Sequence, residues 1–156
     1  DELRTTGLIK AIGLGVNENK VSMDALAIGD WDVFLLAGRY TLLEQKAVDK
    51  LFPACRKVGT SIISRGPFNL GVLVGRDTWN YTKFPKEIID KVRALGVVAD
   101  EFGIPLPTTV LQFPLGDEII YPVIPSPRDE GEFEQIVTCF KTPVPKEFWN
   151  TLKAKK

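Results

Sequence analysis

The chain has 156 residues, of which 44% are hydrophobic and 26% charged, a composition that fits one globular domain over residues 1–156. Its 20 basic and 20 acidic residues cancel, so a nucleic-acid partner, which needs a positive surface, is not expected. No apolar run reaches the roughly 18 residues of a membrane span and no signal-peptide pattern opens the chain, so we expect a cytoplasmic protein without a membrane partner.

The first 60 residues predict two units, each a strand followed by a helix. Residues 9–15 predict a buried strand with a glycine-lined end, and Asn17 is placed to cap a helix. That helix should turn three residues inward: Val21, Ala25 and Ile28. Residues 31–37 predict a second strand, so uniformly apolar that both of its faces should be covered. The helix after it should bend or break at Pro53 and end near Gly59.

Two further units complete the chain. Residues 61–64 predict a third strand, followed by loops over residues 65–71 and 77–84. The clearest helical stripe comes next, formed by Ile88, Val92, Leu95, Ala99 and Phe102. A short helix beginning near Pro107 leads to Ile119 and Ile120 and then to a fourth strand over residues 122–124. The last two helices should bury Phe133, Ile136, Val137 and Phe140, and then Phe148, Trp149 and Leu152.

The chain contains two cysteines and no histidine. Cys55 and Cys139 lie far apart in predicted helices, so we expect buried free thiols. Because histidine and clustered carboxylates are missing as well, no metal site is expected.

No hairpin signal separates consecutive strands, and a helical segment follows each of them. A parallel return needs a crossover long enough to hold a helix, so the four strands should be parallel and the fold α/β. Four such units equal half of an eight-stranded barrel. The outer strands of a half barrel leave backbone groups unpaired, and apolar rows such as Phe34 and Leu36 should be exposed inside it. We therefore expect the chain to pair with a missing N-terminal half or with a second copy.

Four segments carry a resemblance to known proteins: residues 7–17, 35–45, 66–69 and 123–125. In order and spacing they resemble the aldo/keto reductase superfamily, most closely the branch that contains D-threo-aldose 1-dehydrogenase, also called L-fucose dehydrogenase. The resemblance implies a (β/α)8 TIM barrel, of which this chain would be the second half, strands five to eight. In the family, the Asp, Tyr, Lys and His that reduce a carbonyl lie on earlier strands, so no catalytic residue is assigned here.

The resemblance implies an NAD(P)-dependent oxidoreductase that acts on a sugar or an aldehyde, with this chain as its cofactor-binding half and inactive alone. By resemblance, Tyr40 lays its ring on the nicotinamide and Asn17 bonds the carboxamide of that ring. A core aromatic and a helix cap are the alternative roles of these two residues. Arg65 adds a positive charge beside a loop that resembles the one that wraps the pyrophosphate, formed by Gly66, Pro67, Phe68, Asn69 and Gly71.

The segment after the last strand resembles the family's grip on the adenosine end of the cofactor. Ser126 and Arg128 occupy it, in front of a helix whose N-terminal dipole favours a phosphate. Glu132 stands about where NADP-selective members have a basic residue. A carboxylate repels a 2′-phosphate but accepts a hydrogen bond from a ribose hydroxyl, so NAD is preferred to NADP, although Arg128 favours NADP.

Two other functions stay open. A half barrel without the catalytic tetrad could serve as a non-catalytic binding or assembly module. A phosphate-binding aldolase or isomerase barrel would need a strand lysine, for which Lys10 is the candidate.

Overall fold

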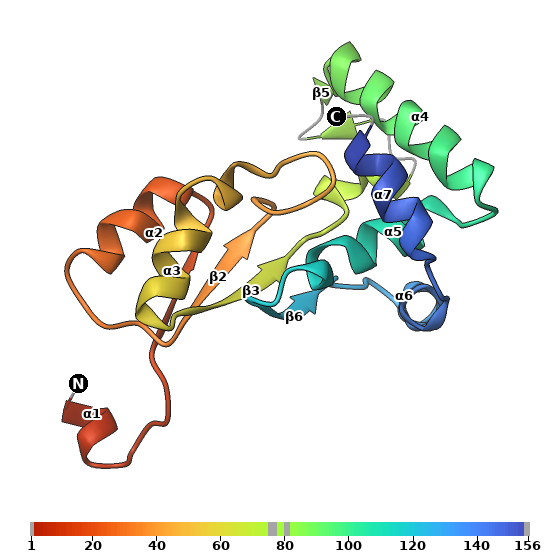
Figure 1. Ribbon diagram of the computed structural model, residues 1–156. Coiled ribbons are helices and arrows are strands. Elements are labelled where there is room, and N and C mark those ends of the chain that lie inside the picture. The colour runs from red at the N-terminus through yellow and green to blue at the C-terminus, as the bar shows by residue number, and fades with distance from the viewer. Residues whose placement is uncertain (1, 75–77, 80–81, 155–156) are drawn as a thin grey trace.

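The computed structural model describes residues 2–74, 78–79 and 82–154 (Figure 1). Its main element is a four-stranded parallel sheet, whose strands follow one another in the order β1-β2-β3-β6 across the sheet. The strands are β1 (Gly13–Val16), β2 (Val33–Ala37), β3 (Ser61–Arg65) and β6 (Ile120–Ile124). The predicted α/β class and the parallel pairing are confirmed.

Helices connect and follow these strands (Figure 1). The α-helices are α1 (Glu2–Thr5), α2 (Asn19–Leu26), α3 (Leu51–Val58), α4 (Lys86–Glu101), α5 (Leu106–Gln112), α6 (Glu130–Lys141) and α7 (Lys146–Ala154). Short 3-10 helices are η1 (Lys46–Val48), η2 (Asn69–Val74) and η3 (Phe113–Gly116). Inside the predicted loop 77–84, of which residues 77 and 80–81 lie outside the described chain, β4 (Thr78–Trp79) pairs antiparallel with β5 (Thr82–Lys83).

Among the described residues, no helix by itself has both the length and the apolarity to cross a membrane. The helix α4 and the segment Leu106–Gly116 meet that test only as a pair, and the pair is bent by 103°.

The helices α2 and α3 cover one face of the sheet (Figure 1). Phe34 and Leu36 of β2 and Ile62 of β3 point to this face, and each is at most 1% exposed. They belong to one core cluster with Phe52 and Cys55 of α3. The expectation that Phe34 and Leu36 would be exposed is wrong, because successive strand residues alternate between faces and this row faces the helices.

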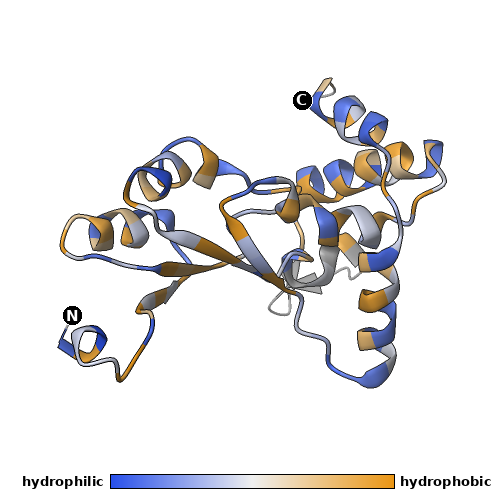
Figure 2. Ribbon diagram, turned by 60° about the horizontal axis from the view of Figure 1, so that its bottom comes forward, coloured by the Kyte–Doolittle hydropathy of each residue, from blue (hydrophilic) through white to orange (hydrophobic). Residues whose placement is uncertain are grey.

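The opposite face of the sheet is open. Val33, Leu35 and Ala37 alternate with the buried residues of β2 and are only half-buried, and so is Ile63 of β3. In Figures 1 and 2 the helices that pack on the sheet lie on its other side. The expectation that both faces of residues 31–37 would be covered is therefore wrong for the described chain.

The first strand is shorter and more exposed than predicted. β1 starts at Gly13, not at residue 9, and its residues are half-buried or exposed. A Cβ atom built on Gly13 would lie 2.6 Å from the carbonyl oxygen of Val33. Glycine at this position therefore allows β1 to approach β2 closely.

The cap and inner face of α2 also differ from the prediction. The N-cap residue is Glu18, whose side chain makes no capping hydrogen bond, so the assignment of Asn17 as the cap is wrong. The helix buries Ser22 and Ala25. Val21 and Ile28, which were expected to face inward, are exposed.

The helix α3 is continuous through Pro53. It begins at Leu51, so the proline lies in the first turn, where its missing N–H costs no helical hydrogen bond. Gly59 ends the helix as predicted, with a left-handed φ of 81°. Cys55 is a buried free cysteine, and burial raises the pKa of its thiol to about 11. Cys139 is also free but only half-buried.

The C-terminal helices form a second packed region. As predicted, α4 presents its stripe to the interior, where Ile88, Val92 and Leu95 pack against a cluster that contains Leu73 and Phe84. The prediction for α7 is confirmed by Phe148, which is 1% exposed. Its ring lies at right angles to that of Phe102, with 5.6 Å between the centroids.

The predicted inner face of α6 is wrong. The helix has no fully buried residue, and Phe133 and Phe140 are 55% and 61% exposed. Gln112 of α5 holds the C-terminal end of α6, because its side-chain amide donates to the carbonyl oxygens of Cys139 and Thr142, at 2.7 Å each.

Candidate functional site

The carboxyl ends of three strands meet at one edge of the sheet. Ala37 of β2 lies opposite Arg65 of β3, which in turn lies opposite Ile124 of β6. The loops that follow are tied to the neighbouring strands, since Gly38 N–H donates to the Arg65 carbonyl (2.8 Å) and Gly66 N–H donates to the Ile124 carbonyl (3.1 Å). This edge is where open parallel sheets bind their ligands.

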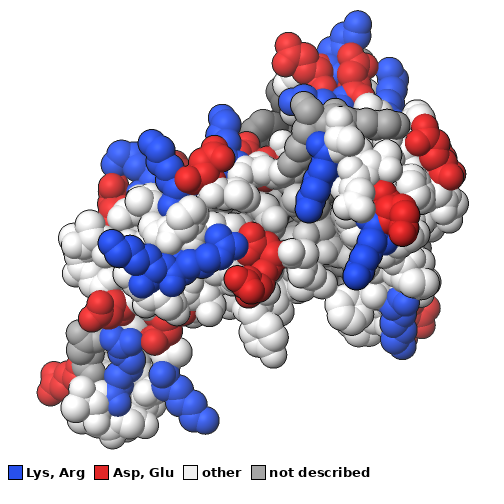
Figure 3. All heavy atoms as spheres, in the orientation of Figure 1, with Lys and Arg blue, Asp and Glu red and all other residues white. Residues whose placement is uncertain are grey.

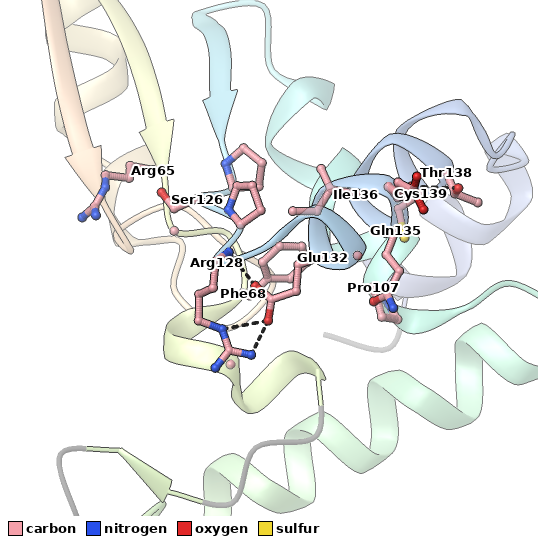
Figure 4. A pocket seen from close by; sticks show the side chains of 16 residues that line it. Arg65, Phe68, Pro107, Ser126, Arg128, Glu132, Gln135, Ile136, Thr138 and Cys139 are labelled. Carbon is pink, nitrogen blue, oxygen red and sulfur yellow. Dashed lines mark hydrogen bonds and ion pairs between the residues drawn. The ribbon is translucent and has the colours of Figure 1, made fainter.

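A groove of about 820 Å³ opens where the loops after β3 and β6 meet α6 (Figure 4). This volume is in the range of small-molecule binding sites. The structure brings six of the predicted cofactor residues into its wall: Gly66, Phe68, Gly71, Ser126, Arg128 and Glu132. The other four predicted residues, Asn17, Tyr40, Pro67 and Asn69, do not line it.

The wall also contains residues that the sequence analysis did not assign. Gln135 and Cys139 follow Glu132 by three and seven positions on α6, with Ile136 between them. This spacing places all four on one helix face. The same periodicity could have found them, once Glu132 was taken as a wall residue.

The loop after β3 contains several left-handed residues. Their φ angles are 67° at Gly66, 47° at Asn69 and 100° at Gly71. The turn is closed by two hydrogen bonds, from Asn69 N–H to the Gly66 carbonyl (3.3 Å) and from Gly71 N–H to the Phe68 carbonyl (2.9 Å). Backbone of this kind can direct N–H groups toward an anion. Within the described residues, the buried Oδ1 of Asn69 has no hydrogen-bond partner.

The opposite wall starts at Ser126, a non-glycine residue with a φ of 59°. Asp129 then caps α6, because its Oδ1 accepts a hydrogen bond from Glu132 N–H at 2.8 Å. The N-terminus of α6, with its partial positive charge, therefore lies in the wall of the groove.

Arg128 and Glu132 form an ion pair in this wall (Figure 4). Arg128 Nε donates to Glu132 Oε1 and Arg128 N–H donates to Glu132 Oε2, at 2.8 Å each. The hydrogen bond and the charge of Glu132 raise the pKa of the Arg128 guanidinium. Each charge is thus largely offset by the other before any ligand binds.

Tyr40 lies in the core. Tyr40 is 7% exposed, and its ring centroid is 4.8 Å from that of Phe52 and 5.2 Å from that of Phe113. Burial raises the pKa of its hydroxyl to about 12. This position corrects the expectation that Tyr40 offers its ring to a ligand and favours the alternative of a core aromatic.

Asn17 lies just after β1 and is exposed. Its carbonyl oxygen accepts a hydrogen bond from Arg39 Nε. The structure therefore places Asn17 at the same strand edge as the groove but outside its wall.

The parallel sheet and its helices define an α/β protein, with a groove at the carboxyl ends of the strands. Sequence comparison narrows the class: the aldo/keto reductase family matches residues 1–156. The chain belongs to the aldo/keto reductase family, as its strand ends predicted.

Two characterised relatives are similar over nearly the whole chain. Pyridoxal 4-dehydrogenase from Microbacterium luteolum is 38% identical over 157 residues, which cover 98% of this chain and 46% of that protein. D-threo-aldose 1-dehydrogenase from Pseudomonas sp is 29% identical over 157 residues, covering 97% of this chain and 48% of the relative. The chain thus spans about half the length of these relatives.

The fold is also similar to that of solved structures. An aldo-keto reductase from Bacillus halodurans, in its holo form, superposes with a TM-score of 0.78 at 20% identity. The match covers 98% of this chain and 52% of that one. It supports the α/β fold with its parallel sheet.

Proposed function

We propose that this chain is the cofactor-binding part of an NAD(P)-dependent oxidoreductase that acts on a sugar or an aldehyde. The observation that carries the proposal is the groove between the glycine-containing loop 66–71 and the N-terminus of α6. The N-terminus of α6 carries a partial positive charge into the groove, which suits a phosphate of a dinucleotide. The volume of about 820 Å³ suits a ligand of nucleotide size.

The residues of the groove have separate roles in this proposal. The loop would lie along the pyrophosphate, with Gly66, Phe68 and Gly71 in the wall, while Pro67 and Asn69 would shape the turn. Ser126 and Arg128 would contact the adenosine end. The bound nicotinamide would accept or donate the hydride, and Asn17 would bond its carboxamide. Tyr40 has no part, because its ring lies in the core.

We further propose that the chain forms strands five to eight of a (β/α)8 barrel and that the catalytic residues come from a preceding half. The sequential strand order and the single helix-covered face of the sheet support this reading. So does the coverage of only 46% and 48% of the two relatives. Because these relatives act on pyridoxal and on D-threo-aldose, we propose pyridoxal-like aldehydes and L-fucose-like sugars as the substrates to test.

NAD remains the preferred cofactor of this proposal, for a modified reason. Glu132 holds Arg128 in an ion pair, so the positive charge that a 2′-phosphate needs is already offset. NAD has no 2′-phosphate, so its affinity does not depend on the charge that Glu132 offsets.

The test uses Cys139, a half-buried free thiol in the groove wall. The complete native protein is alkylated with iodoacetamide at pH 8, with increasing NAD or NADP, and the modified peptides are quantified by mass spectrometry. Saturable protection of Cys139, at lower concentrations of NAD than of NADP, is expected. Cys55 is the internal control: it is buried and its pKa is raised to about 11, so it should react slowly throughout.

Labelling of Cys139 that ignores both nucleotides would contradict the proposal. Unfolding the protein in urea should make both cysteines reactive, which verifies that the slow reaction of Cys55 comes from its burial.

A further inference from the structure

One charged residue stands out in the sheet. The strands β1, β2, β3 and β6 lie entirely within the described residues, and Arg65 is the single charged residue among them. It is the last residue of β3, a central strand, and it is exposed. No ion pair or side-chain hydrogen bond of Arg65 is found in the described part of the chain.

The direction of Arg65 follows from strand alternation. Ser64 is 1% exposed and faces the helices, so Arg65, like Ile63, points to the open face of the sheet. In Figure 4 its guanidinium turns away from Arg128 and Glu132. The cation therefore stands at the carboxyl edge of the sheet, between the groove and the open face.

The backbone at Arg65 is held from both sides. Its carbonyl accepts a hydrogen bond from Gly38 N–H at 2.8 Å, and its register partners are Ala37 and Ile124. Neither partner is charged. A cation on a fixed strand end without a neighbouring carboxylate is prepared to receive an anion from outside the sheet.

The other arginine of the groove wall cannot serve in the same way. Arg128 is held by Glu132 through its Nε and its backbone N–H. Arg65 is thus the groove-lining arginine that is not in an ion pair within the described residues.

We propose that Arg65 is a specificity-determining residue that binds an anionic oxygen of the substrate, beside the carbon that exchanges the hydride. This inference rests on the proposed function. If the adenosine end of the cofactor lies along α6, its reacting end points to the edge of the sheet where Arg65 stands. A guanidinium there favours a carbonyl compound with an ionised hydroxyl, carboxylate or phosphate over a neutral sugar.

The experiment compares a substrate that carries an ionised oxygen with one that carries none, in the complete native protein. Pyridoxal carries a ring hydroxyl that is ionised at neutral pH, whereas L-fucose is uncharged. Arg65→Gln should raise the KM for pyridoxal about tenfold or more and change that for L-fucose less than about threefold. Arg65→Lys should recover part of the loss. Lys57→Gln, which removes an exposed charge from the far side of α3, should change neither.

Cofactor binding is followed in the same variants through protection of Cys139 by NAD. Unchanged protection in Arg65→Gln is expected. Equal losses for both substrates would overturn the inference, and weaker protection with an unchanged KM for pyridoxal would assign Arg65 to the pyrophosphate instead. A native protein that NAD does not protect and that oxidises neither substrate would sink the proposed function, and this inference with it.

Discussion

Under the proposed function, the choice between NAD and NADP would depend on one pair of side chains, Arg128 and Glu132. Arg128 and Glu132 lie one turn apart and are 65% and 29% exposed. Because the pair is near the surface, its own contribution to stability is small. Its effect on a ligand is larger, since a 2′-phosphate would compete with Glu132 for the guanidinium.

Removing the charge of Glu132 should make NADP a better ligand. Glu132→Gln leaves Arg128 without its carboxylate partner, so we expect the Kd for NADP to fall about three- to tenfold, with little change for NAD. The effect should shrink in 0.5 M salt, which screens exposed charges. Titration of the native protein and the variant with both nucleotides measures this.

The matched control is Glu130→Gln. Glu130 lies in the same first turn of α6 but outside the wall of the groove. It changes the helix-terminal charge by the same amount, so an equal gain in NADP affinity from both variants would refute the pairing argument.

At the scale of the elements, the contact between β1 and β2 depends on the absence of one side chain. A Cβ atom on Gly13 would meet the carbonyl oxygen of Val33 at 2.6 Å and Val33 Cγ1 at 2.7 Å. Gly15 lies two residues further along the same strand, and a Cβ atom placed on it would have no atom of a residue beyond its two chain neighbours within 4 Å. The two glycines therefore form a natural comparison.

We expect Gly13→Ala to lower the free energy of unfolding of the native protein by about 1–3 kcal/mol, because backbone must move to admit the methyl group. Gly15→Ala should be neutral or slightly stabilising, since alanine loses less conformational entropy on folding. Urea denaturation of both variants gives the comparison. A Gly15→Ala variant as unstable as Gly13→Ala would show that the strand itself, not the contact with Val33, needs glycine.

The sequence predicted those elements whose signals are local. Gly59 ends α3 because a left-handed residue is cheapest as glycine, and the α4 stripe follows from helical spacing alone. The predicted break at Pro53 is wrong, because a proline is harmless in a helix that starts just before it. The predicted inner face of α6 is wrong as well, since which side of a helix is covered depends on elements that periodicity does not locate.

The candidate site shows the same division. The glycine-containing loop and the residues after β6 could be assigned from the chain, because both directly follow predicted strands. Tyr40 could not be placed, since a strand-end aromatic can turn to a ligand or to the core, and contact with Phe52 decides the matter.

For the whole molecule, the open face of the sheet is the dominant feature. On the side of the molecule that Figure 3 draws, acidic and basic side chains are intermingled. Half-buried Val33, Leu35 and Ile63 on the open face offer an apolar surface instead. Association through that face would be hydrophobic and only weakly sensitive to salt.

The isolated 156-residue chain should therefore dimerise or aggregate. Leu35→Lys places a charge on the open face and should shift sedimentation toward the monomer while the helical circular dichroism is kept. Leu36→Lys, one residue away, puts the same charge into the core, where Leu36 is 1% exposed, and should unfold the chain. A parent chain that sediments as a monomer and melts cooperatively would contradict this expectation.

The weak packing of α6 has a consequence for the groove that it borders. The helix α6 has no fully buried residue. Side-chain hydrogen bonds hold its two ends: Asp129 caps the N-terminus, and the amide of Gln112 donates to a carbonyl at the C-terminus. A ligand that contacts both α6 and the loop after β3 would add contacts along the middle of the helix and make this wall more rigid. Binding of such a ligand would therefore be coupled to ordering of α6, and local motion of this helix would be smaller with the ligand bound than without it.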